Sequence, residues 1–203
     1  MAVAVLVPIK AFGQAKRRLA GHLSPDERVR LATYMAARVL AAAGDLPVFV
    51  VCDDEHVASW ARRHNAEPLW RPAMGLNGAV TSGVDALGAA GFDRVIVSHA
   101  DLPLATDLNR LAQWNGVTLV PDRRDDGTNV AVVPTASGFT FGYGAGSFRR
   151  HGSEAIRRSL PLRVLRSARL GWDVDVPADL DHDELRGLLP SLPSLPTSPA
   201  NQH

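Results

Sequence analysis

Arg94-Val95-Ile96-Val97-Ser98-His99-Ala100-Asp101-Leu102-Pro103-Leu104 is the stretch on which the fold of this chain depends. Its first half is a continuous apolar run, which is typical of a buried strand in a parallel sheet. Pro103 cannot extend a central strand, so the chain leaves the sheet near Asp101. Ligands of open α/β sheets bind at the carboxyl ends of the strands, where a carboxylate can hold a divalent metal against a phosphate. The alternative is that Asp101 only caps a turn, and this stretch alone favours neither interpretation.

A second acidic stretch, residues 172–180, lies far away in the sequence. Pro177 suits the first position of a helix, and Asp179 then lies in the first turn, where a carboxylate interacts favourably with the helix dipole. Asp173 and Asp175 have no such capping role, and in an extended segment both point to the same face. Carboxylates gathered in this way are costly unless a cation lies between them. The pattern therefore favours a metal site over the alternative of solvated loop aspartates.

The composition indicates one soluble α/β domain. The chain has 203 residues, of which 46% are hydrophobic and 21% are charged, and it is long enough to bury a sizeable core. A net charge of +1 gives no sign of nucleic-acid binding. We expect no membrane segment and no signal peptide, and hence a cytoplasmic protein. The single cysteine, Cys52, excludes an internal disulfide and ends an apolar run, which predicts a packed thiol.

Apolar runs alternate with amphipathic stretches, so we expect a mainly parallel sheet covered by helices in a three-layer α/β/α architecture. Strands are expected at residues 3–7, 48–51, 67–70, 94–97, 117–120, 130–133 and 162–165. Helices are expected at residues 25–43 with a capping box at Ser24, 54–64 with Asp53 or Asp54 as cap, 78–91, 106–114 with Thr106 as cap, 147–158 and 177–189. The domain is expected to span residues 1–189, and residues 190–203 are expected to form a disordered Pro/Ser-rich tail.

Three loops carry groups that suit anion binding. Residues 8–19 gather four cations after the first strand, although they match neither a Walker P-loop nor a dinucleotide-binding motif. Residues 71–80 run from turn residues into a helix, and Asn77 is either the helix cap or a binding group. Residues 142–147 place glycines at alternate positions before Ser147, which favours an anion-binding turn over a flexible hairpin tip.

Taken together, these motifs resemble one family, the guanylyltransferases of deazaflavin coenzyme (F-420) biosynthesis, which join GMP to 2-phospho-L-lactate or phosphoenolpyruvate. The resemblance covers residues 3–181, and its elements occur in the family's order. They are residues 7–10 with 15–19, 75–77, 100–104, 121–123 with 127–129, 144–148 with His151, and 173–177. The chain departs from the family at Arg17, where Ser or Thr is usual, and at Asp125 and Asp126, where small residues are usual. Carboxylates at the latter positions would repel an anionic substrate unless they turn outward or bind a metal.

The resemblance implies a nucleotidyltransferase fold and a role for each candidate residue. Lys16, Arg18 and Asp101 would be catalytic. Lys10, Lys16, Gly75 and Asn77 would bind the nucleotide, and Thr128, Gly144 and Ser147 would bind the phosphorylated acid. Asp101, Asp173 and Asp175 would hold Mg²⁺ as the cofactor, with the division between Asp173 and Asp175 left open.

The implied reaction is attack of the acid's phosphate on the α-phosphorus of GTP, with release of pyrophosphate. Phosphoenolpyruvate is the expected acid, with 2-phospho-L-lactate and 3-phosphoglycerate as rivals, and the sequence leaves open a homodimer and a hand-off to the next enzyme of the pathway. One alternative is a related nucleotidyltransferase with another nucleotide or acceptor, such as a molybdopterin cytidylyltransferase. The other is a non-catalytic nucleotide-binding regulator, which would have no need of metal ligands from distant strands.

Overall fold

A computed structural model of the chain describes residues 1–188, so the expected tail at residues 190–203 lies outside the described residues. The strands are β1 (Val3–Pro8), β2 (Val48–Cys52), β3 (Glu67–Trp70), β4 (Arg94–Ser98), β5 (Val117–Pro121), β6 (Thr128–Pro134) and β7 (Leu162–Val164). The α-helices are α1 (Pro25–Ala41), α2 (Glu55–Arg63), α3 (Gly75–Ala89), α4 (Ser147–Arg157) and α5 (Asp183–Leu188). Short 3-10 helices are η1 (Phe12–Gln14), η2 (Arg17–Leu19), η3 (Leu108–Gln113), η4 (Thr135–Ser137) and η5 (Pro177–Leu180). None of the helices within residues 1–188 combines the length and the apolar character needed to cross a membrane.

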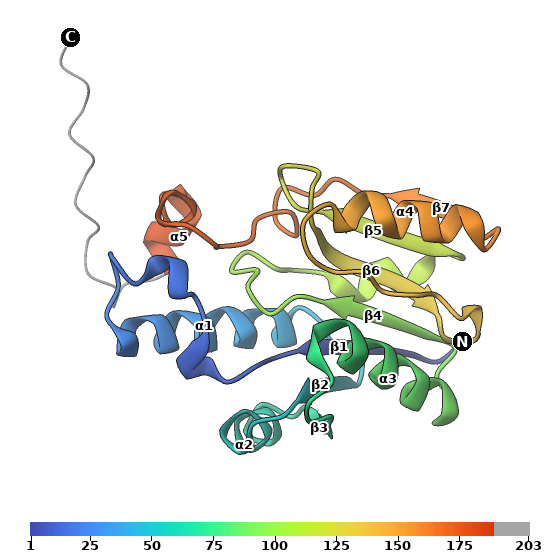
Figure 1. Ribbon diagram of the computed structural model, residues 1–203, viewed down its shortest axis with the longest axis horizontal. Helices are drawn as coiled ribbons and strands as arrows, with labels where there is room; N and C mark the ends of the chain where they lie inside the picture. Colours follow the sequence, from blue (N-terminus) through green and yellow to red (C-terminus); the bar gives the residue numbers. More distant parts are fainter. Residues whose placement is uncertain (189–203) are drawn as a thin grey trace, which may run out of the picture.

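The strands form one sheet of seven in the order β3-β2-β1-β4-β6-β5-β7 (Figure 1). All neighbouring pairs are parallel except those that β6 makes with β4 and with β5. The expected mainly parallel α/β sheet is confirmed. Because β6 runs against its neighbours, its first residues lie at the edge of the sheet where β1 and β4 end.

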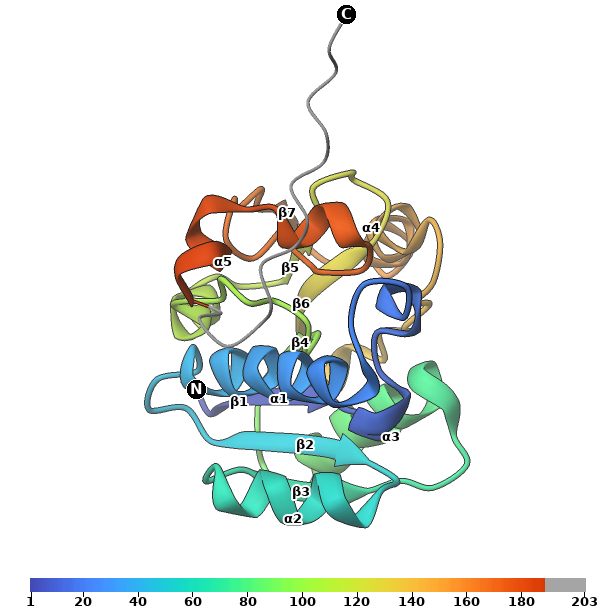
Figure 2. The same cartoon turned by 90° about the vertical axis from the view of Figure 1, so that its left-hand side faces the viewer.

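Helices cover both faces of the sheet (Figure 2). Val3, Val5 and Val7 of β1 pack with side chains of α1, α2 and η3 in one cluster. Ala4 and Leu6 face the other way and pack with α3 and α4 in a second cluster. Side chains alternate along a strand, so an apolar run such as β1 supplies both layers. The buried strands are therefore continuous apolar runs, as their position in the centre of the sheet requires.

The helix starts follow local capping chemistry. Ser24 Oγ accepts a hydrogen bond from the Glu27 amide, and the Glu27 carboxylate accepts one from the Ser24 amide, which confirms the expected capping box of α1. Asp54, rather than Asp53, caps α2 by accepting from the Val57 amide at 2.9 Å. Asn77 lies inside α3, whose N-cap is Met74, so the interpretation of Asn77 as a helix cap is wrong.

Two expected α-helices are wrong. In place of the helix expected at residues 106–114, Leu108–Gln113 form the 3-10 helix η3, and its N-cap is Asp107, in the left-handed conformation with φ 54°, rather than Thr106. Leu108 and Leu111 are buried, and the three-residue turn of a 3-10 helix brings such an i, i+3 pair to one side. The segment at 177–189 is divided into η5 and α5. The Asp179 carbonyl accepts the Trp172 indole N–H at 3.0 Å, so it does not continue a helical ladder.

A third apolar cluster lies outside the two faces of the sheet and joins η2, α1, α5 and two loops. It includes Leu19, Leu104 and Val174, all fully or almost fully buried. Leu19 lies three positions after Lys16, and Leu104 lies three positions after Asp101. Val174 lies between Asp173 and Asp175. Burying these three side chains against one another therefore brings together charged residues from three distant parts of the sequence.

Candidate active site

Lys16 joins two of these segments through its ammonium group. Its Nζ atom lies 2.7 Å from Asp101 Oδ2 and 3.2 Å from Asp175 Oδ1, and only 9% of its side chain is exposed. Arg18 lies at the rim, with Nη1 3.7 Å from Asp175 Oδ2. Burial acts to lower the pKa of Lys16, but Asp101 and Asp175 outweigh it and raise the pKa above its ordinary value. Lys16 therefore stays charged at neutral pH, in a left-handed backbone conformation with φ 54° that marks a constrained site.

Asp101 and Asp173 each turn one carboxylate oxygen into the protein. Oδ1 of both residues is buried and has no hydrogen-bond partner within residues 1–188. Burial acts to raise the pKa of Asp101, but Lys16 and, to a smaller extent, His99 lower it overall. The pKa of Asp173 is raised, first by burial and then by the charge of Asp101. These two carboxylates thus interact unfavourably with each other, and a cation between them would relieve the repulsion.

The arrangement of the carboxylates suits a magnesium ion bound by two of them better than one bound by all three. Among the described side chains, no group of three or more His, Cys, Asp or Glu is arranged to hold a metal ion. Asp175 is instead engaged by Lys16 and Arg18. Mg²⁺ is commonly bound by one or two carboxylates, with water and substrate phosphates completing its six ligands. The inward oxygens of Asp101 and Asp173 suit that arrangement, and Asp175 neutralises the two cations beside it.

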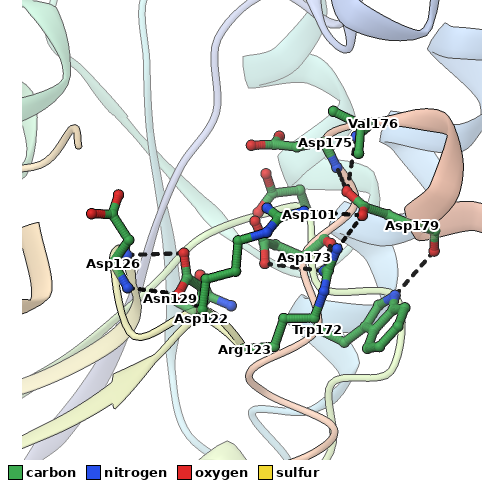
Figure 3. Close-up of polar contacts among 12 residues, drawn as sticks. Asp101, Asp122, Arg123, Asp126, Asn129, Trp172, Asp173, Asp175, Val176 and Asp179 are labelled. Atoms are coloured by element: carbon green, nitrogen blue, oxygen red, sulfur yellow. Dashed lines mark hydrogen bonds and ion pairs between the residues drawn. The ribbon is translucent and has the colours of Figure 1, made fainter. Parts of the chain in front are cut away.

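Asp179 holds the acidic segment in place (Figure 3). Its buried carboxylate accepts hydrogen bonds from the Asp175 amide at 2.7 Å and the Val176 amide at 2.8 Å. It also forms an ion pair with Arg123 and lies 3.6 Å from Arg124 Nη2. Such a set of partners compensates the cost of burying a charge.

Arg123 connects this segment to the loop between β5 and β6. Its guanidinium donates to the Asp173 carbonyl at 3.1 Å and lies 4.4 Å from the centre of the Trp172 ring. Sequence reasoning assigned no role to Arg123. Its position in the motif at residues 121–123 was the only available signal, because its partner Asp179 lies 56 residues further along the chain.

The candidate acid-binding residues form a separate buried network. The Thr128 amide donates to Ser147 Oγ at 3.0 Å, and the Thr128 hydroxyl contacts His151 Nδ1 at 2.9 Å. The Gly142 amide donates to His151 Nε2 at 2.9 Å. Gly144 and Gly146 have φ values of 115° and 71°, which favour glycine and allow the turn to enter α4. Thr128, Ser147 and the glycine turn are therefore brought together as expected, with His151 as the central partner.

The contacts of His151 specify its tautomer. Nε2 accepts from the Gly142 amide, so it carries no proton, and the neutral ring must carry its proton on Nδ1. Nδ1 then donates to the Thr128 oxygen, and the Thr128 hydroxyl hydrogen stays available to another acceptor. Burial, followed by the charge of Arg150, lowers the pKa of His151 to about 4. The ring is neutral at physiological pH.

Because the pKa of His151 is lower in the folded protein than its ordinary value of 6.5, its effect on stability depends on pH. The unfolded chain binds a proton as the pH falls through 6.5, whereas the folded chain does so only near pH 4. We therefore expect the folded state to lose on the order of 3 kcal/mol from this group between pH 7 and pH 4. Thermal melting of the wild type and His151→Gln across this range measures it.

The gap in melting temperature between the two proteins should shrink toward pH 4, because Gln does not titrate. His56→Gln, which replaces an exposed histidine on α2, is the matched control and should follow the wild-type pH dependence. Parallel pH profiles for wild type and His151→Gln would contradict the assignment.

The carboxylates that depart from the family pattern have internal partners. Asp125 forms an ion pair with Arg166 on the exposed surface, and both carboxylate oxygens accept hydrogen bonds of 3.0 to 3.2 Å. Asp126 Oδ1 accepts from the Gly146 amide at 3.0 Å and so supports the glycine turn. Asp125 thus turns outward, and in this arrangement its charge does not repel an anionic substrate. Asp126 orders the glycine turn.

Lys10, Gly75 and Asn77 take no part in the hydrogen bonds and ion pairs of the charged cluster in the described chain. Lys10 and Gly75 line a cavity of about 90 Å³ at the ends of β1 and β2 and the start of α3. Asn77 Oδ1 accepts from the Tyr143 amide at 2.7 Å, which ties α3 to the glycine turn. The Tyr143 ring contacts both His99 and His151, at 4.9 Å between ring centres. The candidate residues therefore form three groups: the charged cluster, the glycine turn and this cavity.

Comparison with known proteins shows a consistent set of relatives. The profile of the family described as guanylyl transferase CofC like matches residues 3–187. A phosphoenolpyruvate guanylyltransferase from Sphaerobacter thermophilus is 38% identical over 199 residues, covering 94% of this chain and 95% of the relative. A 2-phospho-L-lactate guanylyltransferase from Methanocaldococcus jannaschii is 26% identical over 189 residues, covering 90% and 83%. A solved nucleotidyl transferase from Methanothermobacter has a TM-score of 0.64 at 15% identity, covering 88% and 94%, which shows the fold.

Proposed function

The chain belongs to the CofC-like guanylyl transferase family, and on that premise we propose that it transfers GMP from GTP to the phosphate of a phosphorylated three-carbon acid in coenzyme F-420 biosynthesis. The observation that carries the proposal is the buried Lys16 ammonium between Asp101 and Asp175, with Asp173 beside them. Phosphoenolpyruvate is the proposed acid, because the relative of that name is 38% identical whereas the 2-phospho-L-lactate enzyme is 26% identical.

The reaction needs charge neutralisation more than a base. An oxygen of the acid's phosphate forms a bond to the α-phosphorus of GTP, and the bond from that phosphorus to the β-phosphate oxygen breaks to release pyrophosphate. The attacking phosphate is already ionised near neutral pH, so no side chain has to remove a proton. Catalysis then consists of bringing two anions together in line and stabilising the charge that develops on the leaving group.

The charged cluster supplies groups for that task. Lys16 is proposed to contact the phosphates of GTP, with Arg18 at the rim stabilising the leaving pyrophosphate. Asp101 and Asp173 would hold Mg²⁺ through the oxygens that lack hydrogen-bond partners in the described chain. When bound there, this ion would offset the negative charge of the phosphates and orient them. Asp175 would keep Lys16 and Arg18 in position.

The glycine turn is proposed to bind the acid. The Thr128 and Ser147 oxygens both accept hydrogen bonds from within the protein, so both hydroxyl hydrogens can be donated to a carboxylate or phosphate. The amides of Gly146 and Ser147 already donate to the Asp126 carboxylate and the Gly144 carbonyl, so the two hydroxyl groups are the donors that this turn offers. Phosphoenolpyruvate and 2-phospho-L-lactate differ at one carbon, which is planar in the first and tetrahedral in the second. A difference of that size lets an enzyme discriminate between two substrates by about 1–3 kcal/mol.

Pyrophosphate release with different acids tests the proposal. Protein, Mg²⁺ and GTP are incubated separately with phosphoenolpyruvate, 2-phospho-L-lactate and 3-phosphoglycerate, and CTP is substituted for GTP in a parallel set. We expect release with GTP and phosphoenolpyruvate above the other pairs. Faster release with 2-phospho-L-lactate would reverse the order of the acids. Release with CTP instead of GTP would favour the cytidylyltransferase alternative, and no release from any pair would contradict the proposed activity.

A further inference from the structure

The cavity at the ends of β1 and β2 has apolar walls and a charged rim. Its walls include Ile9 from the segment after β1, Val51 from β2, and Leu76 and Ala79 from α3. Lys10, Asp53 and Arg71 also line it. Lys10 belongs to the same loop as Lys16, which lies in the charged cluster. A nucleotide with its base in this cavity could therefore direct its phosphates along that loop, and apolar walls suit the faces of a base.

Asp53 has no hydrogen-bonding or ion-pairing partner in the part of the chain that the structure describes. Its side chain is exposed, and no hydrogen bond or ion pair engages it within residues 1–188. The helix that follows is capped by Asp54 instead, through the Val57 amide. An unpaired carboxylate is unexpected in a cavity lined by Lys10, a residue of the loop that is proposed to bind anionic phosphates. Its presence suggests a ligand that offers hydrogen-bond donors at this point.

Arg71 is held in a defined orientation at the same rim. Its Nε atom donates to Ser82 Oγ at 2.8 Å, and Nη1 donates to the Trp70 carbonyl at 2.8 Å. No protein acceptor within residues 1–188 engages Nη2. The cavity therefore presents an acceptor, Asp53, together with a prearranged donor, Arg71.

We propose that Asp53 selects guanine, by accepting hydrogen bonds from N1–H and the 2-amino group of the base, and that Arg71 donates to its O6 atom. Among the four common bases only guanine carries two adjacent donors, which a carboxylate can accept together, beside an acceptor. Adenine and cytosine each place a ring acceptor next to a single amino group, and uracil places its one N–H between two carbonyls. The inference rests on the proposed function, which identifies the nucleotide as GTP. It adds the residue that recognises the base.

Exchange of the base tests this assignment. Xanthine carries a carbonyl where guanine carries the 2-amino group, so the amide of Asp53→Asn can donate to it. Binding of GTP and XTP to the wild type, Asp53→Asn and Asp45→Asn is measured by titration calorimetry. Asp45 is exposed and lies just before β2, at the opposite end of that strand, which makes Asp45→Asn a matched control.

We expect the wild type and Asp45→Asn to bind GTP about 100-fold or more tightly than XTP, and Asp53→Asn to reverse this preference. An unchanged ratio of the two affinities in Asp53→Asn would overturn the assignment. A gain in XTP binding cannot come from misfolding, so the reversal is informative even if the variant is less stable. Because binding needs no turnover, a wild type that selects GTP but releases no pyrophosphate would refute the proposed activity and leave this inference standing.

Discussion

Asp101→Asn is expected to lower the rate of pyrophosphate release by about 100-fold or more while the protein stays folded. The Asp101 carboxylate contacts Lys16 through one oxygen and turns its other oxygen inward without a hydrogen-bond partner in the described chain. Asn has nearly the same shape, but it removes the charge that would bind the cation. Lys16 keeps its contact with Asp175, so we expect only a small change in melting temperature. Initial rates at increasing Mg²⁺, with thermal melts, measure both effects.

Asp107→Asn is the matched control, because Asp107 is an exposed carboxylate on the same loop, and Asn tolerates its left-handed conformation. It should retain the wild-type rate. Asp173→Asn should resemble Asp101→Asn, since Asp173 also has a buried Oδ1 without a hydrogen bond in the described chain, although this atom lies 3.9 Å from Arg123 Nη1. Asp175→Asn should be milder. Near-normal turnover of Asp101→Asn at saturating Mg²⁺ would show that this carboxylate does not bind the ion.

Lys16→Met is expected to reduce the rate by about 10²–10³-fold, the usual cost of removing one donor that stabilises developing charge. It should also lower stability, because Asp101 is left without its cation. Breaking a fully buried ion pair costs about 3–5 kcal/mol, and we expect about 2 kcal/mol here because 25% of the Asp101 side chain is exposed. Initial rates at saturating GTP and chemical denaturation measure these two losses.

The stability loss in Lys16→Met should depend on pH in a defined direction. In the wild type the pKa of Asp101 is lowered, so its stabilising effect is present at neutral pH and is lost as the pH falls through that pKa. Without Lys16, burial raises the pKa of Asp101, and the destabilising charge disappears on protonation. The difference between variant and wild type should therefore be largest near pH 7 and shrink in acid.

Two controls separate the ion pair from general effects of the substitution. Arg17→Met removes an exposed cation next to Lys16 and should behave like the wild type in rate and stability. The double variant Lys16→Met with Asp101→Asn should recover part of the stability lost by Lys16→Met alone, because no unpaired charge remains. If the stability losses of the two single variants simply add in the double variant, Lys16 and Asp101 do not form a coupled pair.

Much of the fold follows from local patterns in the sequence. The apolar runs at residues 95–97 and 48–51 predict central strands, and they lie in β4 and β2. Ser24 and Asp54 are helix caps because their side chains reach backbone amides three residues away, a relation that sequence spacing reveals. The 3-10 helix η3 could not be predicted in this way, because its conformation depends on packing of Leu108 and Leu111 against distant parts of the chain.

The candidate site was predictable as a set of residues and not as a set of contacts. The acidic stretches indicated Asp101 and Asp175, and the family resemblance indicated Lys16, but the contacts of Lys16 join residues 85 and 159 positions apart. Spacing alone does not reveal that the ammonium lies between these carboxylates. The buried His151 belongs to the motif that begins at residue 144, but its contact with the Thr128 hydroxyl arises only because β6 and α4 pack together.

The fate of the α-phosphate of GTP tests the proposed transfer of GMP most directly. The protein is incubated with Mg²⁺, phosphoenolpyruvate and GTP labelled with ³²P at the α-position, and in a parallel reaction at the γ-position. We expect the α-label to move into a new species that contains the acid linked to GMP and forms only when the acid is present, while the γ-label appears in pyrophosphate. Recovery of the α-label in GDP with the γ-label in inorganic phosphate, or of all label in unchanged GTP, would contradict the proposed transfer.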